Sequence, residues 1–155
     1  MVTVATMLRG ILSSDPVTVL ASGILLYRRA PDGPRLLLLR NRDAGHWGFA
    51  KGRRDAEDTH EVSCALREVG EETGYTGLSL HAGFRAELEY LVRNDGEPYP
   101  KRVVYFLAEA PGREPVLSEE HEDHRWADPR EADELLNFGQ LRDLAQSAFA
   151  ALAGP

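Results

Sequence analysis

The chain has 155 residues, of which 18 are Lys or Arg and 25 are Asp or Glu, so its formal net charge at pH 7 is −7. With 43% hydrophobic residues it can bury a sizeable core, which argues against a disordered or fibrous protein. The net negative charge argues against nonspecific binding to nucleic acid or to an anionic membrane, because both need a basic surface. We expect a single domain over residues 1–155.

The cysteine content and the N-terminus predict a compartment. Cys64 is the only cysteine, which excludes an intramolecular disulfide and a multi-cysteine zinc site. Residues 1–12 contain Arg9 and lack an apolar run of signal-peptide length, and no segment approaches the ~20 apolar residues of a membrane span. The sequence therefore predicts a soluble cytoplasmic protein, with residues 1–15 as a loose N-terminal segment.

The first half of the chain predicts a hairpin followed by a helix. Residues 17–27 and 35–39 are apolar runs separated by a Pro-Asp-Gly-Pro turn, as in a hairpin. The aromatic and glycine-rich segment 45–52 is typical of a strand that ends in a loop. Apolar residues then recur at three- and four-residue spacing over 59–72, which predicts a helix, and Gly74 is placed to end it in a left-handed conformation.

The second half predicts more strands and one further helix. Residues 78–92 and 103–108 have strand character and are separated by the turn-rich segment 94–98, while 140–152 carry an apolar helical stripe. Residues 111–115 are expected to be loose. Strands before, between and after helices indicate a mixed sheet covered by helices, which is an α/β or α+β sandwich.

The most informative stretch is acidic and lies at the end of the first predicted helix. Glu68, Glu71 and Glu72 are spaced i, i+3 and i+4 and therefore share one helical face. The carboxylates repel one another there, and the negative end of the helix dipole costs a further ~0.3–1 kcal/mol each. A hard divalent cation such as Mg²⁺ would reverse both penalties, because it prefers oxygen ligands and bridges to phosphates. The alternative is a solvated acidic face.

Four stretches of the sequence match a known signature with the pattern G-x5-E-x7-R-E-U-x-E-E-x-G-U, where U is a bulky apolar residue. They are Gly52, Arg67–Val69, Glu71–Glu72 and Gly74–Tyr75. This segment resembles the Nudix box, the signature of hydrolases that act on a nucleoside diphosphate linked to another group. The resemblance implies an α/β/α sandwich with a mixed central sheet, in which the box forms a loop, a helix and a loop that bind Mg²⁺ or Mn²⁺.

The resemblance also implies roles for the residues of the box. The metal ligands would be Glu68, Glu71 and Glu72, and Arg67 would hold a carboxylate in place as a bidentate partner. The chain departs from the pattern by one extra residue before the helix. Counting from Gly52 therefore places the first glutamate of the pattern at Asp58, and either Asp58 or Glu57 could do its supporting work.

The resemblance extends beyond the box, over roughly residues 17–150, to the asymmetric diadenosine tetraphosphate hydrolases, which split their substrate into ATP and AMP. The matching stretches are His46–Gly52, Gly83–Tyr90, Val103–Ala108, Leu117–Glu122 and Leu135–Phe138. Ala50 departs from that group, which usually has proline before the Lys-Gly pair.

Two aromatic residues are candidates for binding a base. Tyr90 and Phe138 together would form a stacking clamp, in which each ring contributes ~1–3 kcal/mol and discriminates little between bases. The alternative for Tyr90 is a rim aromatic with no ligand.

The phosphates would meet cationic and glycine residues. Lys51 can present its ammonium group to them while Gly52 lets the backbone approach closely. Weaker candidates for the polyphosphate channel, each of which could instead be ordinary surface, are His46, Lys101, Arg102 and Tyr105.

The remaining candidates lie around a later acidic run, residues 119–124, whose simplest interpretation is a hydrophilic loop. By resemblance Glu120 would complete the metal site or act as general base. His121 and His124 are interpreted as bystanders, because Mg²⁺ prefers oxygen. Cys64 is expected to be buried packing.

These residues predict metal-assisted hydrolysis of a phosphoanhydride in a small nucleotide. Glu72 or Glu120 would take the proton of the attacking water, and Glu71 and Arg67 complete the catalytic set. Other substrates of the same box remain open, namely nucleoside triphosphates, capped RNA ends, diphosphoinositol polyphosphates and nucleotide sugars. So does a nucleotide sensor without catalysis.

Overall fold

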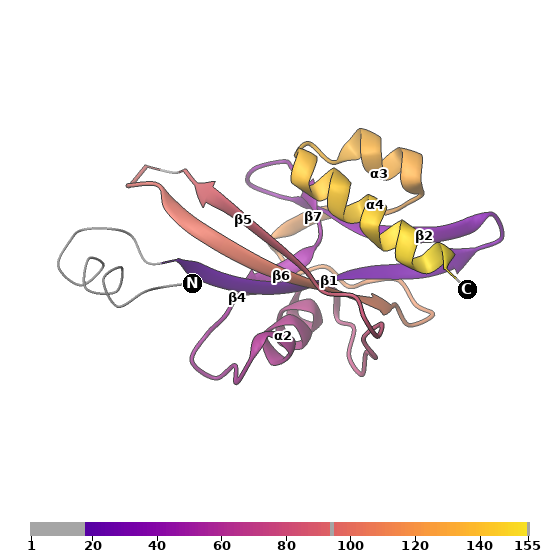
Figure 1. Cartoon of the computed structure of the whole chain (residues 1–155), viewed down its shortest axis with the longest axis horizontal. Helices are drawn as coiled ribbons and strands as arrows, with labels where there is room; N and C mark the ends of the chain where they lie inside the picture. The colour runs from indigo at the N-terminus through magenta and orange to yellow at the C-terminus, as the bar shows by residue number, and fades with distance from the viewer. Residues whose placement is uncertain (1–17, 94, 155) are drawn as a thin grey trace.

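The computed structural model describes residues 18–93 and 95–154 (Figure 1). The elements of this part of the chain are β1 (Val19–Ala30), β2 (Gly33–Asn41), β3 (Trp47–Gly48), β4 (Ala50–Arg53), α2 (Glu61–Thr73), β5 (Ala86–Val92), β6 (Tyr99–Glu109), β7 (His121–Ala127), α3 (Pro129–Leu135) and α4 (Gly139–Ala153). The segment predicted to be loose, residues 1–15, lies outside the described residues. None of the described helices is long and apolar enough to cross a membrane.

The seven strands of the described residues form one mixed sheet with β1 at its centre. The strand order is β3-β2-β1-β6-β5, with β4 paired to β1 and β7 paired to β2. β1 and β6 run parallel, and the other pairs are antiparallel. The predicted hairpin is confirmed, since β1 and β2 pair from Tyr27 opposite Leu36 to Ala30 opposite Gly33.

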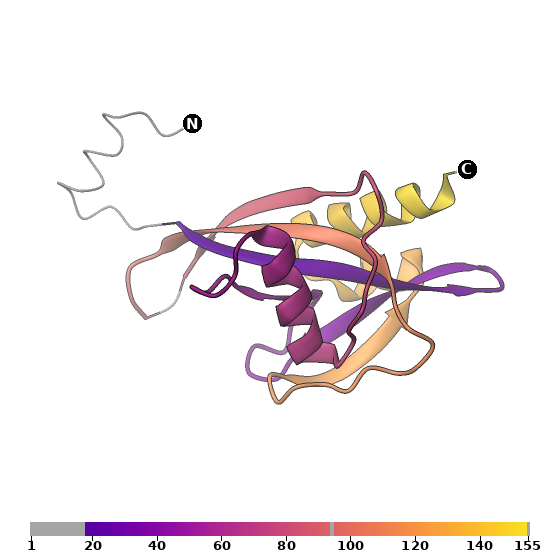
Figure 2. The same ribbon diagram turned by 90° about the horizontal axis from the view of Figure 1, so that it is seen from below.

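Helices cover both faces of this sheet (Figures 1 and 2). α2 packs on one face over β1 and β4, while α3 and α4 lie on the other. β1 is buried on both sides: Leu25 belongs to the core under α4, and its neighbours Ile24 and Leu26 belong to the core under α2. A strand covered on both faces has a continuous apolar sequence, as the central part of β1 does. The predicted α/β/α sandwich with a mixed sheet is confirmed.

The helix α2 has defined ends. At its start the Nδ1 of His60 accepts the backbone N–H groups of Val62 (3.2 Å) and Ser63 (3.4 Å). At its end Gly74 adopts a left-handed conformation, with φ at 75°, and donates its N–H to the carbonyl of Gly70. The predicted glycine cap is confirmed, and the helix begins two residues later than Thr59.

Three elements differ from the sequence-based expectation. The hydrophilic run 119–124 is largely strand β7, because this strand pairs with β2 at the side of the sheet and most of its first side chains reach solvent. The short helix α3 begins at Pro129, where Asp128 and Glu131 cap each other's backbone N–H groups. The predicted strand 78–92 is a strand only from Ala86 onward, apart from an isolated bridge at Leu80.

Gly23 of β1 is where the sheet is most closely packed against β4. A Cβ atom there would overlap the carbonyl oxygen of Ala50 and the Cβ of Lys51. We expect Gly23→Ala to displace β4 and to lower the free energy of unfolding by about 1–3 kcal/mol, measured by thermal denaturation. Gly112→Ala is the matched control, because a Cβ at Gly112 meets no heavy atom within 4 Å. Equal melting temperatures for the two variants would contradict this packing.

Candidate active site

The acidic face of α2 is anchored to β4 through Glu72. The side chain of Glu72 lies in the layer between helix and sheet, where the residue is 4% exposed. Its Oε1 accepts the backbone N–H of Lys51 at 3.2 Å. Burial raises the pKa of Glu72 to about 8, and although the Lys51 N–H opposes this rise, the charges of Glu120 and Glu68 add to it.

Glu68 also lies against β4, where its carboxylate packs on Gly52. A Cβ at Gly52 would occupy the position of the Glu68 carboxylate, so only glycine allows β4 and α2 to approach this closely. Burial raises the pKa of Glu68, with Glu71 and Glu120 adding to the rise while Arg67 lowers it. Gly52 thus leaves space for the carboxylate of Glu68. It is not among the residues that line the cavity described below, although it is a predicted substrate residue.

Arg67 lies at the centre of a carboxylate cluster on the exposed side of α2. Its Nε and one terminal nitrogen bind the two oxygens of Asp58 at 3.0 and 2.9 Å. Its other terminal nitrogen lies 2.9 Å from Glu71 and 3.0 Å from Glu68. The guanidinium also donates to the carbonyl of Arg53 at 2.9 Å, so it ties the loop after β4 to the helix.

The extra residue before the helix leaves the support of Arg67 in place. The side chain of Asp58 is 3% exposed, and the bond from Arg67 holds its pKa well below the usual range. Glu57, the other candidate, is exposed. The loop therefore accommodates one more residue while Asp58 turns inward to the guanidinium.

Glu120 is brought to α2 by the segment before β7. The N–H groups of Val116 and Ser118 donate to the carbonyls of Thr73 (2.9 Å) and Glu72 (3.3 Å), so the segment is bound to the last turn of the helix. The backbone N–H of Arg42 donates to the Glu120 carbonyl at 2.8 Å. These bonds place the exposed Glu120 where its charge raises the pKa of both buried glutamates of α2.

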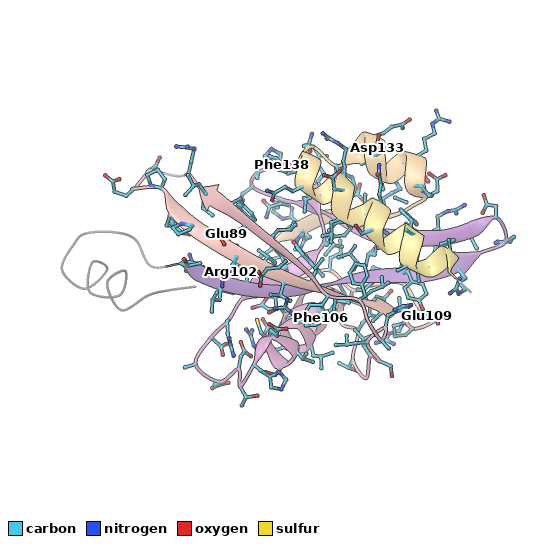
Figure 3. All side chains as sticks on the ribbon, in the orientation of Figure 1. Glu89, Arg102, Phe106, Glu109, Asp133 and Phe138 are labelled. Atoms are coloured by element: carbon cyan, nitrogen blue, oxygen red, sulfur yellow. The ribbon has the colours of Figure 1, made fainter. Side chains whose placement is uncertain are left out.

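A cavity of about 560 Å³ opens on the opposite face of β4 from α2. The predicted substrate residues that line it are His46, Lys51, Tyr90, Tyr105 and Phe138. The rings of His46 and Phe138 meet edge to face, with centroids 5.0 Å apart. Phe138 lies at the start of α4 (Figure 3) and is 49% exposed, so its ring is free to contact a ligand.

Three of the residues predicted for the polyphosphate channel do not present a free side chain to the cavity. Tyr105 is 1% exposed and packs edge to face on Phe49, so it forms the floor of the cavity. Lys101 does not line the cavity, but burial and the nearby charges of Lys51 and Arg53 lower its pKa to about 8. Arg102 is directed elsewhere and pairs with Glu89 of β5 at 3.4 Å (Figure 3).

His121 lies in the cavity, although the sequence predicts a bystander. The residue is 9% exposed, lines the cavity, and has its Nε2 3.9 Å from Glu72. Burial lowers its pKa, against the charge of Glu120. His124 remains on the surface, near Glu114. The only signal in the sequence was the position of His121 next to Glu120.

The predicted metal ligands fit a divalent cation by their chemistry. They offer only carboxylate oxygens, and burial raises the pKa values of Glu68 and Glu72, which is a penalty on the charged form that a nearby cation would offset. Within the described ranges, no three acidic, histidine or cysteine side chains already form a cage. The reason is that Glu68 and Glu71 pair with Arg67, so they would have to turn away from it to bind a metal.

Comparison with known proteins agrees with this arrangement. The model of the NUDIX domain matches residues 17–147. The chain belongs to the Nudix hydrolase family. This Nudix protein is 36% identical over 137 residues to the asymmetrical bis(5'-nucleosyl)-tetraphosphatase of Mus musculus, covering 81% of this chain and 90% of that protein. The enzyme of the same name from Caenorhabditis elegans is 30% identical, with coverage of 89% and 99%.

Solved structures show the same relationship. A binary complex of the C. elegans Ap4A hydrolase superposes with a TM-score of 0.76 at 30% identity, covering 86% of this Nudix chain and 98% of that one. The dihydroneopterin triphosphate pyrophosphohydrolase of E. coli shares the fold, with a TM-score of 0.68 at 22% identity and coverage of 84% and 94%. The family and these relatives make the chain a pyrophosphohydrolase.

The pairing of Arg67 with Asp58 predicts a difference between two neighbouring acidic residues. Asp58→Asn keeps an acceptor oxygen for the loop but removes the charge that holds the guanidinium. We expect kcat/KM to fall about 10- to 100-fold, as when a group that orients a metal ligand is lost. Glu57→Gln should retain full activity, because Glu57 is exposed. Equal activities of the two variants in a steady-state hydrolysis assay would contradict the role of Asp58.

The pKa of Glu72 predicts how the stability of the metal-free Nudix protein changes with pH. Because the folded-state pKa of about 8 lies above the ordinary value of 4.5, the folded protein keeps a proton that the unfolded chain releases. Glu72 therefore contributes stability that is fully present below about pH 4.5 and is lost as the pH rises through about 8.

Thermal melts in EDTA test this dependence. We expect Glu72→Gln, which keeps the side-chain volume and lacks the charge, to melt like the wild type near pH 5 and at a higher temperature near pH 9, by about 2–4 °C for each kcal/mol that the buried charge costs. Glu109→Gln, at the exposed end of β6, is the control and should match the wild type at both. A stabilisation by Glu72→Gln that does not depend on pH would disagree with a raised pKa.

Proposed function

We propose that this Nudix hydrolase cleaves diadenosine tetraphosphate asymmetrically into ATP and AMP, with Mg²⁺ as the metal. The observation that carries the proposal is the position of an aromatic cavity on one face of β4 and the acidic helix on the other. Lys51 belongs to both, since its side chain lines the cavity and its N–H binds Glu72. The names of the relatives from M. musculus and C. elegans support the same substrate.

The metal would be held by carboxylates alone, namely those of Glu68, Glu71, Glu72 and Glu120. When bound, Mg²⁺ supplies a Lewis acid that polarises the phosphate oxygens and favours ionisation of a water molecule. A bound cation would also offset the raised pKa of Glu72, because a buried carboxylate whose charged form is unfavourable alone is stabilised beside a cation. Before a metal binds, Arg67 pairs with Glu68 and Glu71 and is itself held by Asp58, so the carboxylates would turn from the guanidinium to the metal.

The cavity holds one nucleoside and directs its phosphates toward α2. Tyr90, Phe138 and His46 provide aromatic surfaces for a base, and such stacking contributes ~1–3 kcal/mol for each base with little selectivity. Lys51 and Lys101 neutralise the polyphosphate on its way from the cavity to the carboxylates. The lowered pKa of Lys101 fits this place, because a phosphate would stabilise the charged ammonium form that burial disfavours.

The proton of the attacking water is taken by a carboxylate, Glu72 or Glu120. Glu72 is buried beside the phosphate path, whereas Glu120 is exposed on the segment bound to the end of α2. In-line attack on a phosphoanhydride needs positioning and charge neutralisation more than covalent chemistry. The chain supplies both, through the two lysines and the glutamates of α2.

The proposed partner is thus a small nucleotide, and the proposed compartment is the cytoplasm. Cys64 is buried and unpaired, which suits a reducing environment. With a net charge of −7, nonspecific binding of nucleic acid is not expected.

The product pattern tests the proposal. The protein is incubated with Mg²⁺ and, separately, with diadenosine tri-, tetra- and pentaphosphate, nucleoside triphosphates, nucleotide sugars, capped RNA and an inositol pyrophosphate, and the products are separated by anion exchange. We expect diadenosine tetraphosphate to react fastest and to give equal amounts of ATP and AMP. Two molecules of ADP, or faster turnover of another substrate, would contradict the proposal.

A matched pair of variants links the activity to the site. Glu72→Gln should lower kcat at least about 100-fold, because the loss removes a metal ligand and a candidate base. Glu109→Gln should leave kcat unchanged, since Glu109 lies at the far end of β6, away from Phe138 (Figure 3).

A further inference from the structure

His121 is fixed at the junction between the cavity and the acidic helix. It is the first residue of β7, and its backbone N–H donates to the Ser118 carbonyl at 3.2 Å while its carbonyl accepts from the Arg42 side chain at 3.3 Å. Its ring lines the cavity together with Lys51, and its Nε2 lies 3.9 Å from the Oε1 of Glu72, the same oxygen that accepts the Lys51 N–H. The ring therefore has a set position between the base pocket and the carboxylates.

Neither nitrogen of this buried ring has a hydrogen bond within the described part of the chain. Nδ1 is buried without a partner. Nε2 lies 3.9 Å from Oε1 of Glu72, beyond hydrogen-bond range. A buried polar group without a partner destabilises the fold, so an apolar ring of the same shape would serve packing better. A ligand bonded at Nε2, the nitrogen nearer Glu72, would give a reason for a histidine at this position despite the unpartnered Nδ1.

We propose that His121 is a substrate-binding residue whose Nε2–H donates to a phosphate oxygen of the bound nucleotide. A phosphate is favoured over a base because the neighbours of His121 are Lys51 and Glu72, whereas the aromatic wall is made by Phe138 and Tyr90. Nε2 carries an N–H in the protonated imidazole and in the neutral tautomer that has its proton on Nε2, and from either form it can donate to a phosphate oxygen. The inference rests on the proposed function, because it needs a nucleotide with several phosphates in this cavity.

A purely structural role makes a different prediction. The Oγ of Ser118, in the same turn, is also buried without a partner. If the imidazole were kept to bond within this turn, removing its nitrogens would destabilise the protein. If it is kept for the substrate, the same change should leave the stability unchanged or raise it, because an unsatisfied group is lost.

The test uses His121→Phe, which keeps a planar ring without a donor, and His121→Gln, which keeps an N–H group at the distance of Nε2. His124→Phe is the matched control, because His124 lies on the same strand outside the cavity. Calorimetric titrations with Mg²⁺ and a non-hydrolysable methylene analogue of ATP give the dissociation constants. Parallel titrations with adenosine report on the base pocket alone, and thermal melts report on stability.

We expect His121→Phe to weaken binding of the ATP analogue about tenfold and to leave both adenosine binding and the melting temperature at or above wild-type values. His121→Gln should recover part of the affinity, and His124→Phe should behave like the wild type. The inference is overturned if the analogue fails to bind the wild type, if His121→Phe binds it equally well, if affinity for adenosine falls in parallel, or if His121→Phe melts below the wild type. The titrations involve no turnover, so a failure of the proposed activity would appear separately, in the product pattern.

Discussion

The close contact between the backbone of β4 and the carboxylates of α2 is the constraint on which the rest of the site depends. Gly52 has no side chain because Glu68 occupies that space, and the N–H of Lys51 is used to hold Glu72. Gly23 of the central strand allows β4 to lie close enough for both contacts. Three backbone positions thus set the distance between the cavity and the acidic helix.

The negative charge of the protein is unevenly distributed, and part of it lies near this contact. A net charge of −7 should disfavour the binding of polyphosphate. Several of the acidic side chains, however, are gathered around Arg67 and at the buried end of α2. One guanidinium cannot neutralise them all. The excess is local, and it is concentrated where a divalent cation would lie between the protein and a phosphate chain.

The features that were predicted from the sequence are those set by local patterns. Apolar runs and a turn define the hairpin of β1 and β2, and helical spacing with Gly74 defines α2. The strand β7 was missed because its side chains face mostly solvent, so its sequence resembles a loop until pairing with β2 is known.

The candidate site likewise contains residues that the sequence predicts and residues that only the structure reveals. Spacing along one helix placed Glu68, Glu71 and Glu72 together without any knowledge of the fold. Asp58 and His121 depend on how distant segments meet: the loop after β4 folds back to Arg67, and the start of β7 is bound to the end of α2. Neither contact leaves a periodic signal in the chain, so only the structure reveals them.

The position of Phe138 has one more consequence. Three of the four proposed metal ligands belong to α2, but this ring comes from the junction between α3 and α4, near the other end of the sequence and on the other side of the sheet. In the proposed function, the ring that meets the nucleoside and the carboxylates that meet the phosphates therefore lie on separate elements. Substitution at this junction would act on binding of the nucleoside and leave the carboxylates of α2 in place.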